Sequence, residues 1–357
     1  MSEANMSKQE ILLTIVIPIY NVEQYLNQCL DSLLNQTNQN FYVVMVDDGS
    51  TDKSGEIAKM YVTKNPEKYK YVYKKNAGLG AARNTGMKYV NTCYVEFLDS
   101  DDWLKPNVVE SFYNQLHVIS EDVDIFFMKP IIYDMATSKY LPWYDNELLE
   151  DIFREHMVIA PVIDHRMYDL EPNVNRSIWN YRFLKENQFQ FPEGVKWEDV
   201  FPHFYLFHLA KRCALMKNTG FIYRINSGGQ ITASSGRGRM DTITVFAQTF
   251  SYAFAHQWTT SEIAHVVEML IKFTLWNIKV TKNEVLGDFV RGIHGIYRAI
   301  PKSIFFEYQK IFLPGKKRKM FWRIMRSPFW IFFSDVYRYD KLKRILLKFC
   351  GMWRRKR

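Results

Sequence analysis

The sequence predicts an α/β protein, with a mainly parallel sheet flanked by helices and a C-terminal helical region. In the first third of the chain, short apolar runs alternate with segments of helical periodicity. After about residue 240, only helical periodicity is evident. The chain has 357 residues, of which 47% are hydrophobic, so it is long enough for one large domain and an appendage, or for two domains. This composition is typical of a globular protein rather than a disordered one.

The alternation predicts four strands that are separated by helices. The β-branched run LTIVIPIY at 13–20 is typical of a strand buried on both faces. The other predicted strands are 41–46, 71–75 and 93–98. Helices are predicted over 22–34, 56–63, 78–90 and 107–116, the first with Asn21 as its N-cap. This order implies a parallel sheet with right-handed crossovers.

A polar, glycine-rich or acidic segment follows each predicted strand. In chain order these segments read PIYN, DDGSTD, KNAGLGAAR and DSDD. Parallel sheets bind ligands beyond the carboxyl ends of their strands, so we expect the four segments to form one common site. Loops are polar in general, but that alone does not explain the concentration of aspartate here.

The segment DSDD places Asp99, Asp101 and Asp102 within four residues. Carboxylates this close repel one another unless a cation relieves the repulsion, and hard oxygen ligands suit Mg²⁺ or Mn²⁺. Such ions are typically held by one or two carboxylates, with substrate phosphates completing the shell. The segment therefore predicts both a metal and a diphosphate. The alternative is a solvated acidic turn that caps the following helix.

The segment KNAGLGAAR matches a dinucleotide-binding fingerprint only in part. The third glycine of that pattern would fall at Arg83, and the segment follows the third strand rather than the first, which disfavours a dehydrogenase. We expect Arg83 to face the ligand edge, where a guanidinium pairs with phosphate or stacks on a base. A surface salt bridge is the alternative. Asp47 and Asp48 have no evident basic partner, and we expect Asp48 to contact a base or ribose.

The motifs VIPIYN, CLDSLLNQT, VVMVDDGSTDKS, NAGLGAARNTG and YVEFLDSDDWL together resemble the family 2 glycosyltransferases of bacterial capsule and teichoic acid synthesis. The resemblance is dense from about Leu13 to Leu116. It implies the GT-A fold, with a Rossmann-like sheet, and an inverting transfer from a nucleotide-sugar, usually a UDP-sugar, with Mn²⁺ or Mg²⁺. Asp101 would ligate the metal, together with Asp99, which would also approach the ribose. The expected donor-binding residues in this part are Pro18, Tyr20, Asn21, Asp48, Asn76, Gly78, Arg83, Asp99 and Ser100.

The second half of the catalytic domain carries two further family-like segments. In this family the general base is usually the Asp of a Glu-Asp pair, and FPEGVKWEDVFPHFYL at 191–206 contains one. The resemblance implies Asp199 as the base and Glu198 as its helper. The alternative is an acidic pair at a helix start, favoured by the helix dipole. The segment FIYRINSGGQITAS resembles a loop over the diphosphate, which makes Arg224 and Ser227 donor-binding candidates; a structural strand is the alternative.

The predicted domains are a catalytic domain at 1–235, a helical region at 236–314 and a basic aromatic tail at 315–357. Within the first, 11–116 is expected to bind the nucleotide-sugar and 117–235 the acceptor. The tail carries 15 Lys/Arg and two Asp, whereas the rest carries 32 basic and 36 acidic residues. Basic residues interleaved with aromatic ones are typical of a helix on an anionic membrane surface. A structural or partner helix and a nucleic-acid patch are the alternatives.

The remaining features bear on location and on partners. The four cysteines form no CxxC pair, and the N-terminus has no apolar signal-peptide core, so we expect a cytoplasmic protein, peripheral on the inner face of the cell membrane. The expected acceptor is a cell-surface glycan or teichoic acid, polymeric or polyprenyl-linked, and no nucleic-acid partner is expected. Two other functions are considered: a nucleotidyltransferase of sugar-nucleotide metabolism, and a non-catalytic membrane adaptor on the same fold. The sugar, the linkage and the oligomeric state stay open.

Overall fold

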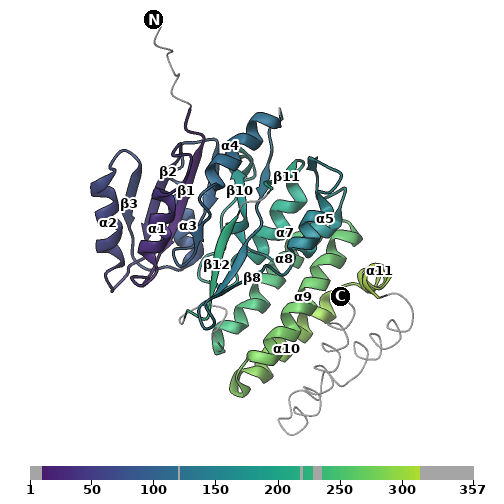
Figure 1. Cartoon of the computed structure of the whole chain (residues 1–357). Helices are drawn as coiled ribbons and strands as arrows, with labels where there is room; N and C mark the ends of the chain where they lie inside the picture. The colour runs from purple at the N-terminus through teal and green to yellow at the C-terminus, as the bar shows by residue number, and fades with distance from the viewer. Residues whose placement is uncertain (1–9, 120, 218–219, 228–234, 314–357) are drawn as a thin grey trace, which may run out of the picture. The chain divides into compact units, whose positions relative to one another are not determined.

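The computed structural model describes residues 10–119, 121–217, 220–227 and 235–313 (Figure 1). The described residues of Met1–Asp164, Leu170–Gly194 and Leu209–Ser227 form one compact unit, which we call the sheet unit. Those of His165–Asp169, Val195–His208 and Gly228–Arg357 form a second, the helical unit. This division differs from the predicted limit at residue 235, because 195–208 groups with the later helices. The predicted basic tail lies outside the described residues.

The main sheet of the sheet unit contains the four predicted strands. They are β1 (Leu13–Ile19), β2 (Tyr42–Asp47), β3 (Tyr69–Tyr73) and β4 (Tyr94–Phe97). They are parallel and lie in the order β3-β2-β1-β4. The sheet continues, with mixed strand directions, through β10 (Ser177–Asn180), β6 (Ile125–Phe127), β11 (Cys213–Leu215) and β9 (Val158–Ile159). The predicted α/β class with its parallel strands is confirmed.

Both faces of β1 are buried, as its apolar sequence predicts. Ile15 and Ile17 belong to a core that also contains residues of α1 (Leu26–Leu34) and α4 (Val108–Val118). Successive side chains of a strand alternate between faces, so Val16 lies on the opposite side. There α3 (Leu79–Met87) packs against β1. A Cβ at Gly86 would lie 2.3 Å from Val16 Cγ1, so only glycine permits this close approach. The remaining crossover helix is α2 (Ser54–Lys64).

A second, four-stranded sheet lies in the same unit and is built from short strands. Its order is β5 (Trp103–Leu104), β12 (Phe221–Ile225), β7 (Ile131–Asp134) and β8 (Lys139–Pro142). Trp103 pairs with Ile222, so β12 lies directly beside the end of the segment DSDD. The short helices α5 (Asn146–Ile152), α6 (Tyr181–Glu186) and η2 (Val174–Arg176) complete the unit.

The helical unit confirms the helical periodicity after residue 240. Its long helices α8 (Asp241–Ala255), α9 (Thr260–Val280) and α10 (Asn283–Ala299) pack together, and α11 (Lys302–Phe312) packs on α9 (Figure 1). The side chain and backbone of Thr259 and Glu262 form a capping box at the start of α9. The unit also contains η1 (His165–Asp169), most of α7 (Val200–Leu209) and η4 (Arg237–Met240). Within the described ranges, no helix has the length and apolar character that crossing a membrane requires.

Candidate active site

The segment that follows β1 lies against the turn that follows β2. The N–H groups of 21–23 donate to side-chain oxygens of that turn, over 2.9 to 3.2 Å, at Ser50, Ser54 and Asp52. Asn21 has a φ of +50°, and its Oδ1 accepts from the N–H of Thr51 at 2.8 Å. The prediction that Asn21 caps the first helix is therefore wrong: α1 begins at Leu26, because residues 21–23 bind the neighbouring turn instead.

The other candidates of this segment differ in exposure. Pro18 is buried inside β1, whereas the Tyr20 side chain is 49% exposed just beyond the strand's carboxyl end. A ring in that position is available to a planar ligand. Pro18 is part of the buried strand and is not exposed at this edge.

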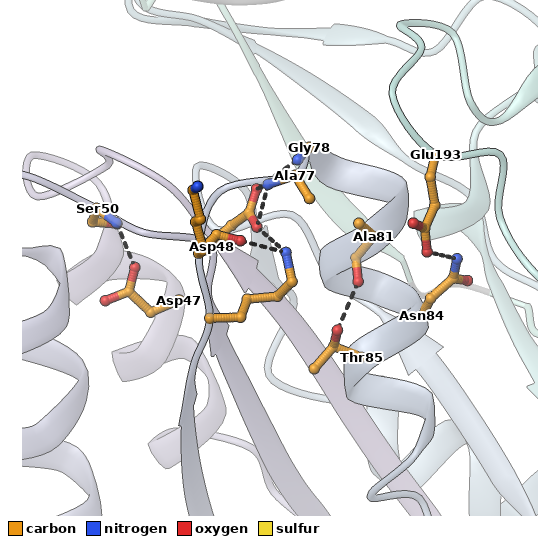
Figure 2. A network of polar contacts seen from close by, with 11 residues as sticks. Asp47, Asp48, Ser50, Ala77, Gly78, Ala81, Asn84, Thr85 and Glu193 are labelled. Atoms are coloured by element: carbon orange, nitrogen blue, oxygen red, sulfur yellow. Dashed lines mark hydrogen bonds and ion pairs between the residues drawn. The ribbon is translucent and has the colours of Figure 1, made fainter.

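The Asp48 carboxylate organises the segment that follows β3 (Figure 2). It accepts hydrogen bonds from the backbone N–H groups of Ala77 and Gly78 at 2.8 to 3.2 Å, and Lys74 Nζ lies 2.5 Å from its Oδ1. Lys74 is the basic partner that the sequence left unidentified; it follows Tyr73, which is paired with Asp47. Asp48 is only 3% exposed, so in this arrangement its direct partners are protein groups.

Gly78 has a φ of +93°, which glycine adopts without strain, and it precedes α3 directly. Asn76, two residues earlier, is exposed at the same edge. Asp48 thus fixes the backbone on which Asn76 and the first turn of α3 are presented. The adjacent Asp47 has a separate role: it accepts from the Ser50 N–H at 2.8 Å and from the Tyr71 hydroxyl at 2.6 Å.

Arg83 and Asp99 form an ion pair between α3 and the end of β4. Arg83 Nη2 donates to Asp99 Oδ1 at 2.8 Å; the arginine side chain is buried, and the aspartate side chain is 25% exposed. The guanidinium carbon also lies 5.3 Å from the centroid of the Phe191 ring. Arg83 therefore lies beside the aspartate segment. It is itself buried and pairs with Asp99, which is partly exposed at the ligand edge.

The stretch 191–193 is anchored on the same helix. Asn84 exchanges two hydrogen bonds with the backbone of Phe191, at 2.8 and 3.0 Å. It also donates to Glu193 Oε1 at 2.9 Å (Figure 2). A Cβ at Gly80 would lie 2.1 Å from the carbonyl oxygen of Pro192, so α3 approaches this stretch closely. The helix that carries Arg83 thus holds the chain just before it leaves the sheet unit at Gly194.

The aspartate segment brings the carboxylates of Asp99 and Asp101 close together. Burial and the neighbouring Asp99 carboxylate raise the pKa of Asp101 to about 6, as expected for two negative charges held close together. A divalent cation would relieve this repulsion, and oxygen ligands are what Mg²⁺ and Mn²⁺ prefer. Among the described residues, no group of three or more His, Cys, Asp or Glu side chains is arranged to hold a metal. Asp101 and Asp99 offer two carboxylates, and Mg²⁺ is typically held by one or two carboxylates with substrate phosphates completing its shell.

Asp102 is turned inward, unlike Asp99 and Asp101. It is 1% exposed, and its carboxylate accepts from the backbone N–H of Arg224 at 2.8 Å and from Asn175 Nδ2 at 3.4 Å. Burial and the two nearby aspartates raise its pKa well above the ordinary value. Ser100 is buried as well, at 5% exposure. The three acids therefore differ: Asp99 and Asp101 are partly exposed, and Asp102 joins the segment to β12.

Arg224 binds the same segment with its side chain. Nε donates to the Asp101 carbonyl oxygen at 2.7 Å, and Nη2 donates to Gln28 Oε1 at 2.7 Å. The guanidinium carbon lies 4.8 and 4.6 Å from the ring centroids of Tyr25 and Trp103. The Tyr25 hydroxyl in turn donates to the Ser227 carbonyl oxygen. Arg224 is only 3% exposed, so it is a support of the aspartate segment in this arrangement.

Gln28 and Tyr25 were not predicted as site residues. They lie in the segment 22–34, whose pattern indicates only a helix with one apolar face, and their contacts are made to residues some 200 positions away. The sequence carries a weak signal for Lys74. It directly follows β3, the strand next to β2, and therefore lies close to Asp48, which directly follows β2.

Glu198 and Asp199 belong to the helical unit and precede α7. Glu198 is 4% exposed and Asp199 is partly exposed. The backbone of Asp199 accepts from the N–H of His203 at 3.0 Å, in the manner of a residue that opens a helix. Trp197, just before the pair, has a φ of +66°. These two acids lie in the helical unit, and the donor-side residues lie in the sheet unit.

Comparison with known proteins assigns the family. Residues 14–193 match the family described as Glycosyl transferase family 2, which is half of the chain, so the chain belongs to this family. It is 31% identical over 227 residues to the glycosyltransferase GlyA of Streptococcus pneumoniae, over 60% of this chain and 31% of GlyA. It is 28% identical over 246 residues to the minor teichoic acid biosynthesis protein GgaB of Bacillus subtilis, over 67% of this chain and 26% of GgaB. The chain thus spans about a third or less of these relatives.

Solved structures support the fold. The chain is similar to S. aureus TarS 1–349, which was solved in complex with UDP-GlcNAc, with a TM-score of 0.65, 19% identity and 82% of each chain covered. It also resembles the mannosyltransferase PcManGT of Pyrobaculum calidifontis, solved with GDP-Man and Mn²⁺, with a TM-score of 0.53, 14% identity, and 92% of this chain and 86% of that chain covered. The GT-A fold expected from the motifs is thereby confirmed.

Proposed function

We propose that this protein is an inverting, metal-dependent glycosyltransferase that moves a sugar from a UDP-sugar to a hydroxyl of a cell-surface glycan or teichoic acid. One observation carries the proposal: Asp99 and Asp101 are partly exposed side by side at the end of β4, with the buried Arg83 on Asp99. Family membership and the teichoic acid relative support the reaction class. The choice of UDP as the nucleotide is based on the similar structure of TarS, which has been solved with UDP-GlcNAc.

The sheet unit would bind the donor. Tyr20 offers an exposed ring to the base, and the stretch 76–78 that Asp48 holds offers polar backbone near the ribose. Asp101 and Asp99 would hold the Mn²⁺ or Mg²⁺ ion, which when bound would stabilise charge on the departing diphosphate. Arg83 adds a fixed positive charge behind Asp99, and a charge that is already oriented lowers the barrier without reorganising during the reaction. Arg224 contributes by supporting the aspartate segment, and the Ser227 carbonyl oxygen contributes by accepting from Tyr25, whose ring lies against Arg224.

Asp199 would act as the general base. Inversion requires the acceptor hydroxyl to lose its proton as it attacks the anomeric carbon from the face opposite the leaving group. A carboxylate that is partly exposed at a helix start can accept that proton. Glu198, which is largely buried beside Asp199, would help to fix the backbone and the electrostatic surroundings of the base.

The acceptor is proposed to be polymeric or polyprenyl-linked, which would bring the enzyme to the inner face of the cell membrane. The support is the composition of residues 315–357, with 15 basic residues interleaved with aromatic ones. Each basic residue near an anionic surface contributes about 1 kcal/mol. A variant ending at residue 314 should then pellet less with phosphatidylglycerol vesicles than the full chain and still hydrolyse donor. Equal pelleting of both proteins would contradict the membrane role of the tail.

The reaction is tested with a panel of UDP- and GDP-sugars in the presence of Mn²⁺. We expect release of a nucleoside diphosphate that is lost in Asp101→Asn and in Asp199→Asn. Asp288→Asn is the matched control, because that partly exposed acid lies on α10 in an ion pair with Arg291. Release of pyrophosphate would indicate a nucleotidyltransferase instead. No turnover with any donor and acceptor would favour the non-catalytic adaptor.

A further inference from the structure

The residue before the Glu-Asp pair has an unusual backbone conformation. Trp197 has a φ of +66°, in the left-handed region that bulky side chains rarely adopt. Such a conformation costs free energy and persists only where the surroundings hold it. Its carbonyl oxygen accepts from the N–H of Val200 at 3.1 Å, so this turn leads directly into α7. The backbone conformation of Trp197 therefore sets the direction in which the chain runs through Glu198 and Asp199 into α7.

The Trp197 ring is held by residues of η4 and α9. The guanidinium carbon of Arg239 lies 5.2 Å from the Trp197 ring centroid and 4.1 Å from that of Trp276. The two indole rings are themselves 5.1 Å apart and nearly perpendicular, at 82°. The Phe273 ring completes the packing, 5.9 Å from Trp197. A cation over two aromatic faces is a favourable arrangement, and more so when it is desolvated.

Arg239 is fixed on its far side as well. Its side chain is fully buried, and Nη1 donates to Asn277 Oδ1 at 3.3 Å. Asn277 is anchored in turn, because its amide donates to the carbonyl oxygen of Phe273 at 2.8 Å. The Arg239 guanidinium is thus anchored on α9 through Asn277, while its planar face packs against the Trp197 ring.

A second contact from the same short stretch holds the preceding residue. Asp241, the first residue of α8, accepts from the backbone N–H of Lys196 through Oδ2 at 2.9 Å. Residues 239–241 therefore fix both the ring of Trp197 and the backbone just before it. All of these contacts lie within the helical unit.

We propose that Arg239 is a positioning residue for the general base: through Trp197 it fixes the backbone from which Asp199 reaches the acceptor. The inference rests on the proposed function, in which Asp199 is that base. It makes the region after residue 235 part of the catalytic machinery rather than an appendage. Arg239 acts through the tryptophan and not on the donor, so its loss should affect turnover rather than donor binding.

The test compares Arg239→Met and Arg239→Lys with Arg291→Met, which removes an exposed arginine of α10 in the same unit. Steady-state kinetics with the donor found by the panel give kcat and KM, and calorimetry gives the UDP affinity. Thermal melts and circular dichroism check that each variant folds. Fluorine NMR of protein labelled with 5-fluorotryptophan resolves the nine tryptophans, and Trp197→Phe assigns the resonance of Trp197.

A misplaced catalytic group can cost up to about 100-fold in rate, so we expect Arg239→Met to lower kcat about 10- to 100-fold with donor KM and UDP affinity nearly unchanged. The Trp197 resonance should shift in this variant and keep its position in Arg291→Met. Arg239→Lys, which keeps the charge but loses the planar guanidinium, should fall between the wild type and Arg239→Met.

Three outcomes would overturn the inference. Weaker UDP affinity in Arg239→Met would make Arg239 a donor ligand. Unchanged kcat with an unshifted Trp197 resonance, beside an inactive Asp199→Asn, would remove the positioning role alone. Wild-type kcat in Asp199→Asn would refute the assignment of the base, and the inference with it.

Discussion

Arg224 and Asp101 are joined by a hydrogen bond from the arginine Nε to the aspartate carbonyl oxygen at 2.7 Å. The backbone N–H of Arg224 donates to the carboxylate of Asp102 at 2.8 Å, across 122 positions of sequence. The aspartate segment is therefore held from both sides by one residue of β12. The backbone that carries the partly exposed Asp101 carboxylate is thus held by the Arg224 guanidinium, which has almost no access to solvent.

Arg224→Met should weaken both the fold and the donor site. The variant leaves the Asp101 carbonyl without its charged donor, which costs about 1.5–3 kcal/mol of stability for a buried hydrogen bond of this kind. We expect lower unfolding free energy in urea and UDP affinity in Mn²⁺ at least several-fold weaker. Arg182→Met, at an exposed arginine paired with Glu186, serves as the control. A variant that loses UDP affinity while keeping full stability would point to direct contact with the donor instead.

Asp48→Asn should loosen the stretch 76–78. The amide keeps one acceptor oxygen for two backbone N–H groups and loses the ion pair with Lys74, so we expect a loss of about 1–3 kcal/mol in unfolding free energy. Nucleotide affinity should fall with it, because the stretch is no longer held in place. Lys74→Met removes the ion pair and a hydrogen bond to the Lys75 carbonyl oxygen but keeps both backbone contacts of Asp48, so it should cost less. Equal losses in the two variants, measured by urea unfolding, would show that the backbone contacts contribute little.

Glu96 should make the wild type less stable as the pH rises. It lies inside β4, fully buried, and burial raises the pKa of its carboxyl from 4.5 to about 8. The folded state thus favours the protonated acid, and this advantage is fully present below about pH 4.5 and is lost as the pH rises to about 8. Glu96→Gln cannot ionise, so it should equal the wild type below about pH 4.5 and exceed it by a few kcal/mol at pH 8. A difference between the two proteins that is independent of pH, in urea unfolding, would refute the assignment.

Gly86→Ala should disturb the contact between α3 and β1. The added Cβ would lie 2.3 Å from Val16 Cγ1, and overpacking of a core costs about 1–3 kcal/mol. Val16→Ala in the same chain should recover part of this loss, since it removes the clashing methyl groups. Gly295→Ala is the control, because that helical glycine of α10 has open space around it and alanine should stabilise it by about 0.4–1 kcal/mol. A neutral Gly86→Ala in thermal melts would mean that α3 shifts freely on the sheet.

The parallel strands and the acidic edge could be predicted because their signals are local. β1 is a run of β-branched residues, and the aspartates directly follow β4. The second sheet could not be predicted, since β5 has two residues and β7 has four, too short for a periodic pattern. The support of Asp101 by Arg224 was hidden for another reason: the contacts join α1, β5 and β12, and the sequence does not reveal which distant segments meet. The sequence predicted Arg224 as a donor-binding candidate but not its contacts with Gln28 and the Asp101 carbonyl oxygen.

The most direct test of the donor site is calorimetric titration of UDP into the protein, with and without Mn²⁺. The account predicts binding that depends on Mn²⁺, is lost in Asp101→Asn, and is retained in Asp199→Asn because that acid serves the acceptor. If UDP and GDP both fail to bind with Mn²⁺ present, or if Asp101→Asn binds UDP as the wild type does, the assignment of the aspartate segment as the donor site is contradicted.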